Sequence, residues 1–288
     1  MKDLRNAIAD QVRQLMGTGP AADLQDPGDD VGLFGPDSVC WRVHGDFTSM
    51  MLGGISALLL QMLHPGALAG VWDHSNFRQD MAGRLRRTAQ FVAGTTYGSS
   101  ARATGLIDKV RSIHDRVAGE VPGGGVYSAN DPDLLTWVHV AEVSSFLRAY
   151  VRHRDPGLSG AEQDRYYTEV AVLAERLGAT DVPRSRAEVE TYLRRLRPQL
   201  RADARTAEVV RILRDHPAPN AAAASVARLF FEAAADLLPD WAGRLHGLRV
   251  PPHRRPAIGL AVRGMGATLR WALRDGAEAR ARRRAAAL

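Results

Sequence analysis

Apolar residues recur at helical spacing along most of the chain, and no stretch shows a sustained alternation of apolar and polar positions. Two segments open with a serine followed three residues later by a glutamate, which is the spacing of a helix-capping box. These pairs are Ser159 with Glu162 and Ser185 with Glu188, and Gly178 suits the end of the first helix. The pattern predicts helices over 2–16, 49–63, 77–97, 99–119, 131–153, 159–178, 186–200, 203–214, 220–237 and 256–286.

This succession of helices predicts an all-α protein with a single globular, multi-helix domain. The chain contains no GxGxxG motif, no phosphate-binding Walker loop and no internal repeat. No long linker separates its halves. We expect an N-terminal helix and loop over 1–37, the main helical domain over 38–250, and a C-terminal basic helix over 251–288 that packs on the domain or trails from it.

The segment from Ser49 to Val71 carries no formal charge and is long enough to raise the question of a membrane span. It is interrupted by Gln61, His64 and Pro65 and contains several glycines. Proline stops a helix unless it stands in the first turn. A buried central helix that ends near Pro65 is therefore the better interpretation.

Composition narrows the classes of protein and of metal site. Hydrophobic residues make up 45% of the 288 positions and charged residues 24%, as in a folded globular protein. Cys40 is the only cysteine, which excludes an intrachain disulfide, a four-cysteine zinc site and an all-cysteine iron–sulfur cluster. The N-terminus lacks the apolar core of a signal peptide, so we expect a cytoplasmic protein.

The formal net charge is +6, and much of the excess lies near the C-terminus in Arg280, Arg282, Arg283 and Arg284. A run of like charges usually forms a solvated helix face. Contact with an anionic surface is the alternative.

His114 is the first polar residue on an apolar helix face. It recurs with Ile107, Val110 and Val117 at helical spacing, so its side chain is expected to point toward the core. A neutral imidazole buried among helices suits an axial iron ligand. An ordinary core histidine bonded to a backbone carbonyl is the alternative.

Arg84 and Thr88 are four residues apart on a face that they share with Met81 and Val92. An arginine that faces inward needs an anion, because an unpaired buried charge is costly. A haem propionate or a substrate carboxylate would serve, and a structural ion pair with Asp80 or Asp108 is the alternative. Thr88 can bond a ligand or only its own helix.

Three further histidines are candidates. His139 shares a helix face with apolar residues and is a second candidate for a buried ligand or a core histidine. His64 is placed to cap the last carbonyls of the apolar helix, and His74 lies in a predicted turn. There is no HExxH motif, no paired Glu-x-x-His motif and no G-x-S-x-G motif. The apolar residues beside His139 are Leu135, Val143 and Phe146.

Taken in order, several short segments resemble the family of MpaB-like oxygenases and rubber oxygenases (latex clearing protein), in an actinobacterial branch of that family. The resemblance covers roughly residues 38–245, and its specificity comes from the order and spacing of the segments. These are ALLLQMLHP at 57–65, HSNF at 74–77, RLRRT at 84–88, YG at 97–98, VRSIH at 110–114, VAG at 117–119, YSANDP at 127–132, WVH at 137–139, DRYY at 164–167 and LLP at 237–239.

The resemblance implies a distantly globin-like all-α core with haem b between helices, so that 38–250 would be a haem-binding oxygenase-like domain. It makes His114 the proximal iron ligand, and Arg84 and Thr88 resemble the arginine and threonine near the haem of rubber oxygenases. Those enzymes have a lysine just before this threonine, where Arg87 stands here. Arginine is bulkier than lysine and does not deprotonate at working pH, so the distal pocket is expected to differ.

The expected function is that of a haem-dependent oxygenase-type oxidoreductase, with Arg84, Arg87 and Thr88 as candidate catalytic residues. The expected partners are a small apolar or prenylated substrate and dioxygen or peroxide, with no nucleic acid and no membrane span. Helix phase predicts a substrate pocket lined by Met62, Phe91 and Val92 among others.

Two other functions stay open at this point. The first is a haem-binding or sensing protein without turnover, in which His139 or His64 is the second axial ligand. The second is a helical interaction protein without a cofactor, in which His114 is an ordinary core residue.

Overall fold

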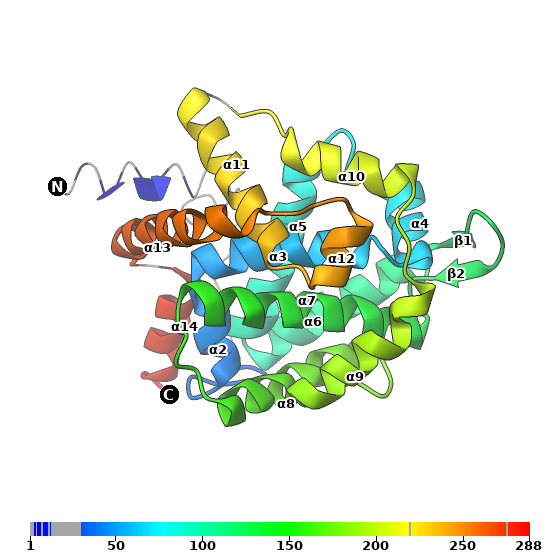
Figure 1. The fold of residues 1–288 in the computed structure, drawn as a ribbon. Helices are drawn as coiled ribbons and strands as arrows, with labels where there is room; N and C mark the ends of the chain where they lie inside the picture. The colour runs from blue at the N-terminus through cyan, green and yellow to red at the C-terminus, as the bar shows by residue number, and fades with distance from the viewer. Residues whose placement is uncertain are drawn as a thin grey trace.

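The computed structural model confirms the all-α class (Figure 1). It describes residues 30–218, 220–274 and 276–288, together with residues 3, 5, 6, 8–10 and 12. The helix predicted over 2–16 and the first part of the loop after it therefore lie largely outside the described residues.

The described helices follow one another closely along the chain. In order they are α2 (Val39–Gly45), α3 (Phe47–Gln61), α4 (Pro65–His74), α5 (Met81–Tyr97), α6 (Ser100–His114), α7 (Pro132–His153), α8 (Gly160–Leu177), α9 (Arg186–Leu196), α10 (Ala204–Arg214), α11 (Ala221–Asp236), α12 (Asp240–Leu245), α13 (Arg255–Ala272) and α14 (Ala277–Ala285), with short 3-10 turns η1 (Arg197–Gln199) and η2 (Pro252–Arg254).

Helices α3 and α7 form the centre of the molecule and pack against each other along their length (Figure 1). α3 is apolar on most sides, which is typical of a helix enclosed by others. Gly53 allows the close approach, because a Cβ atom at this position would lie 2.9 Å from the Cα of Phe146. The buried central helix predicted in the charge-free segment is therefore confirmed as α3, and the rest of that segment belongs to α4.

Among the described residues, no single helix has the length and composition to cross a membrane. Only α2 and α3 taken as a pair meet that test, and the chain bends by 89° between them.

The capping signals placed several helix ends correctly. Ser159 and Glu162 form the capping box of α8, and Gly178 follows its end with a φ of 109°, in the left-handed region. Ser185 caps α9 by accepting a hydrogen bond from the Glu188 amide.

Three predictions about local structure are wrong. The helix predicted over 99–119 ends at His114, and the chain enters a hairpin of β1 (Ala118–Glu120) and β2 (Val126–Ser128). Strands of three residues are too short for an alternating pattern to be recognised. The turn of this hairpin contains Gly123, Gly124 and Gly125, all at positive φ, which glycine adopts without strain.

The second wrong prediction is the turn at His74, which is instead the last residue of α4. Pro65 opens this helix rather than only closing the preceding one, since proline is favoured in a first turn. His64 accordingly caps the amides of Gly66 and Ala67 with its Nδ1 atom, at 3.2 and 3.4 Å, and not the carbonyls of α3.

The third concerns the C-terminus, where the predicted single helix is divided into α13 and α14. α13 packs on α3 and α11, and α14 packs on α5 and α2. The basic residues of α14 do more than form a solvated face. Arg284 donates to the Tyr97 carbonyl at 2.7 Å, and Arg282 pairs with Glu278 at 2.9 Å.

Candidate functional site

Helices α5 and α6 form a hairpin that places the main candidate residues at one end. They are joined by the short connection at Gly98 and Ser99, and they pack against each other. A Cβ atom at Gly94 would lie 2.4 Å from a Leu106 methyl group, so the two helices approach closely there. Because the first turns of α5 lie beside the last turns of α6, Arg84 and Thr88 are at the same end of the hairpin as His114.

The direction of His114 follows from its neighbours on α6. Leu106 faces α5, and Arg111 donates to the Arg176 carbonyl of α8 at 3.5 Å. At 100° per residue, His114 lies between these two directions, in line with Ile107. Its side chain is thus directed toward the space between α5 and α8.

His114 is partly buried, and its Nδ1 atom is enclosed without a hydrogen-bond partner. Burial lowers the pKa of this imidazole, although Asp115 acts in the opposite direction. The ring is therefore held in its neutral form, which is the form that binds a metal ion.

One face of α5 borders this space along the length of the helix. Arg84, Thr88, Phe91 and Thr95 follow one another at intervals of three or four residues, so they form a single row. We call this row together with His114 the α5–α6 strip. It runs from the open end of the hairpin into the interior.

Arg84 is the charged member of the strip. Burial, and then the charge of Arg87, lower the pKa of its guanidinium to about 10. Its Nη1 atom donates to the Ser75 hydroxyl at 3.3 Å, and no carboxylate pairs with it among the described residues. Thr88 is exposed and donates to the Arg84 carbonyl at 3.2 Å, as a threonine in a helix often does.

Arg87 lies outside the strip. It is exposed, and it contacts Asp80 at 3.6 Å and the Asn76 side chain at 3.1 Å. Asp80 therefore pairs with Arg87 rather than with Arg84, and it also caps α5 through the Gly83 amide at 2.7 Å.

A cavity of about 20 Å³ lies at the inner end of the strip, between α2, α5, α7 and α8. This volume holds about one water molecule. Phe91 and Val92, two residues predicted to line a pocket, belong to its wall, whereas Met62 packs elsewhere, with Leu58 and Phe77. The wall consists of Phe34, His44, Phe91, Val92, Thr95, Thr96, His139, Glu142, Val143, Phe146, Val170 and Leu173.

His44 forms a rigid part of this wall. Its Nδ1 atom lies 2.8 Å from the Thr96 hydroxyl, and its Nε2 atom lies 2.9 Å from the Tyr166 hydroxyl. Burial, and then the nearby His139, lower its pKa to about 3. Cys40 lies behind it, fully buried, and burial raises the pKa of that thiol. This thiol is therefore protonated and unreactive.

His139 and Glu142 come from α7, three residues apart. The Nε2 atom of His139 is enclosed without a partner, and burial lowers the pKa of this ring to about 4. Burial raises the pKa of Glu142 to about 7. The predicted inward face of α7 is confirmed, since Leu135 and Val143 are buried beside His139.

Sequence reasoning missed His44 and Glu142 of this wall, and it missed Tyr166, whose hydroxyl bonds to His44 from behind the wall. Glu142 could have been found, since it follows His139 at helical spacing on the same face. His44 follows Cys40 by four residues, but only the structure shows that Tyr166 of α8 reaches it.

The other histidine candidate, His64, is not part of the cavity wall. Its Nδ1 atom caps α4, and its ring lies 6.1 Å from the Trp137 ring. Within the described part of the chain, no three His, Cys, Asp or Glu residues cluster as a metal site would require.

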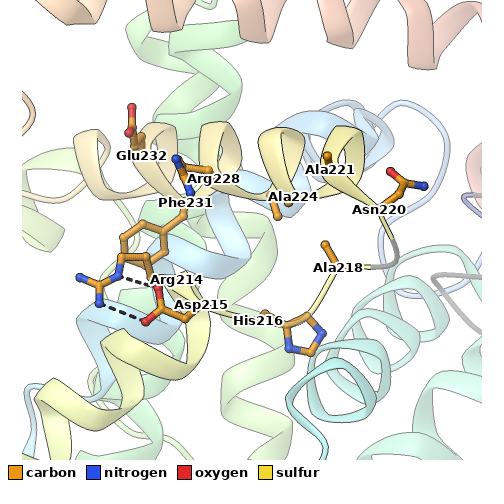
Figure 2. Close-up of a pocket in the computed structure, with 11 residues that line it drawn as sticks. Arg214, Asp215, His216, Ala218, Asn220, Ala221, Ala224, Arg228, Phe231 and Glu232 are labelled. Atoms are coloured by element: carbon orange, nitrogen blue, oxygen red, sulfur yellow. Dashed lines mark hydrogen bonds and ion pairs between the residues drawn. The ribbon is translucent and has the colours of Figure 1, made fainter.

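A larger, open pocket of about 760 Å³ lies between α10 and α11, and it contains none of the predicted site residues (Figure 2). Its wall includes the Arg214–Asp215 ion pair, with 2.9 Å between Nε and Oδ1, and a row of alanines from α11. We place the candidate site at the strip because the unpartnered nitrogen of His114 and the guanidinium of Arg84, which no carboxylate of the described residues pairs, lie there together.

No curated protein and no solved structure matches the chain. The family model described as "ER-bound oxygenase mpaB/B'/Rubber oxygenase, catalytic domain" matches residues 41–271. That range contains the whole α5–α6 hairpin and every residue of the cavity wall except Phe34. The chain therefore belongs to this family of oxygenase catalytic domains.

Proposed function

We propose that the protein is a haem b-dependent oxygenase that oxidises a small apolar or prenylated substrate with dioxygen or peroxide. The observation that carries this proposal is that two groups without their usual partners lie on the same α5–α6 strip. His114 has an enclosed nitrogen without a partner, and Arg84 is a half-buried arginine whose guanidinium no carboxylate pairs among the described residues. A haem group would supply a partner to both residues, because its iron could bind the His114 nitrogen and a propionate could pair with Arg84.

The residues of the strip fit such a group in their chemistry. His114 would hold the iron as a neutral imidazole, and Arg84 would bind a propionate. Arg84 and Phe91 are only partly buried and Thr88 is exposed, so the strip is accessible to solvent although the cavity at its inner end is small. Apolar side chains flank the macrocycle in such sites.

Bound haem would supply an iron centre that activates dioxygen or peroxide. The Thr88 hydroxyl and the Arg84 guanidinium would donate hydrogen bonds to a molecule bound on the strip. Arg87 would act only from a distance, because Asp80 and Asn76 hold it at the surface. Apolar side chains from α5, α7 and α8 would exclude water from the substrate.

A haem-binding protein without turnover is the second candidate function. The free Nε2 atom of His139 favours it, because this imidazole would be a second residue able to hold the iron. Two histidines on the iron would suit binding or sensing rather than oxygen activation.

Oxygen transfer provides the test. The protein loaded with haem is incubated with reductant, isotopically labelled dioxygen and a panel of terpenoid alcohols and hydrocarbons. We expect labelled oxygen in at least one product, and a loss of at least about a hundredfold in rate when His114 is replaced by alanine. Val172→Ala, on the outer face of α8, is the control and should retain full rate. Failure to label any product would argue for the second candidate.

A further inference from the structure

The two groups with free hydrogen-bonding capacity in the cavity wall are His139 and Glu142. His139 is 8% exposed, and its Nε2 atom has no partner. No hydrogen bond or ion pair of the described residues involves the Glu142 carboxyl group. Both side chains point into the same cavity from one face of α7.

The other polar groups of the wall are already occupied. His44 and Thr96 bond to each other, and the second nitrogen of His44 bonds to Tyr166. Thr95 donates to the Phe91 carbonyl at 2.9 Å. The remainder of the wall is hydrocarbon, from Phe34, Phe91, Val92, Val143, Phe146, Val170 and Leu173.

An unpartnered polar group inside a protein is costly, and native structures contain few of them. The enclosed Nε2 atom of His139, with the half-buried and unpartnered Glu142 carboxyl group beside it, therefore indicates a partner that the cavity receives. The volume of about 20 Å³ accommodates a group the size of one hydroxyl. A longer molecule would reach the α5–α6 strip past Phe91 and Thr95, which belong to both the cavity wall and the strip.

We propose that His139 and Glu142 bind the hydroxyl group of an apolar alcohol, whose hydrocarbon part lies along the strip. The inference rests on the proposed function in taking this alcohol as the substrate of the oxygenase.

A hydroxyl matches the pair because it donates one hydrogen bond and accepts others. The apolar wall favours an uncharged partner over a carboxylate or an ammonium group, whose desolvation would be expensive. The charge states agree, since burial lowers the pKa of His139 and raises that of Glu142, which keeps the pair close to neutral.

The test compares two probes that differ in the hydroxyl donor and in one methyl group, and the variants below separate the effect of the donor from that of size. Geraniol carries a hydroxyl group, and geranyl methyl ether carries an oxygen that only accepts. Their affinities for the full-length protein are measured by titration calorimetry, with and without added hemin. We expect geraniol to bind about tenfold more tightly than the ether, as the loss of one buried hydrogen bond predicts.

Variants test whether His139 and Glu142 cause the preference for geraniol over its methyl ether. Glu142→Leu should reduce the affinity ratio to about one, whereas Glu142→Gln should retain most of it. Val172→Ala, on the outer face of α8, should leave it unchanged. If circular dichroism shows that Glu142→Leu does not fold, His139→Phe provides the same readout.

Equal affinity for the two probes, absence of binding, or a preference that survives Glu142→Leu and His139→Phe would overturn the inference. The cavity would then hold water only. A protein that prefers geraniol but binds no hemin would contradict the proposed function alone, so the two failures are distinguishable.

Discussion

Replacement of Gly53 by alanine is expected to destabilise the protein by about 1–3 kcal/mol, which is typical of an overpacked core. The added methyl group would lie 2.8 Å from the Phe146 ring and 2.9 Å from the Phe146 Cα atom. The ring could turn away, but the backbone of α7 could move only if the central helices separated. Gly54 is the matched control. Its methyl group would make one ordinary contact at 3.9 Å with the Phe146 ring, and alanine there should stabilise α3 by about 0.5–1 kcal/mol.

Urea unfolding of the wild type, Gly53→Ala and Gly54→Ala provides the measurement. The two variants should shift the midpoint in opposite directions, with the larger shift for Gly53→Ala. Equal effects of the two substitutions would show that the contact of α3 with α7 at this level is looser than described.

Removal of the buried imidazole of His153 is expected to make the protein more resistant to acid. Both nitrogens of this ring are enclosed without a partner. Burial, and then Arg152 and Arg263, lower its pKa to about 4, against the opposing effect of Asp46. The unfolded chain therefore binds a proton between pH 6.5 and 4 that the folded chain does not, so the free energy of unfolding falls as the pH falls through this window.

The His153→Leu substitution removes this pH-dependent loss of the free energy of unfolding. Its stability relative to the wild type should be about 2 kcal/mol greater at pH 5 than at pH 8. Denaturant unfolding at both pH values measures the difference. His253→Leu, at an exposed position of η2, controls for the loss of any histidine. A gain for His153→Leu that is the same at both pH values would mean that this ring does not remain neutral in the folded protein.

Most of the fold could be predicted from the sequence, because local signals mark where its helices begin and end. The serines that cap α8 and α9 bond to residues only three positions further along the chain. A helix that is apolar on most sides, such as α3, is stable only in the core. The two short strands and α4 were missed for the opposite reason. A strand of three residues has no measurable period, and Pro65 is compatible with either end of a helix.

The candidate site was predictable in part. Arg84, Thr88 and Phe91 share one face of α5 by phase alone, and the resemblance to a family pointed to His114. The partners of these residues come from elsewhere in the chain. His44 meets Tyr166 across more than a hundred residues, and the free nitrogen of His139 is defined by what surrounds it. Such pairings depend on helix packing, which the local pattern does not encode.

The position of Arg87 shows the same limit. Its place before Thr88 resembles that of the lysine in rubber oxygenases, and the sequence alone predicts a catalytic side chain. In the fold, Asp80 and Asn76 hold it at the surface, away from the strip.

The central claim is that His114 binds haem, and the absorption spectrum of the purified protein tests it most directly. The protein is produced with a haem precursor and recorded in the ferric and reduced states beside His114→Ala, with His74→Ala as a control because His74 bonds to the Ala118 carbonyl outside the strip. We predict an intense Soret band for the wild type and for His74→Ala that is lost or shifted in His114→Ala. A colourless wild-type protein that hemin cannot reconstitute, or an unchanged spectrum in His114→Ala, would contradict it.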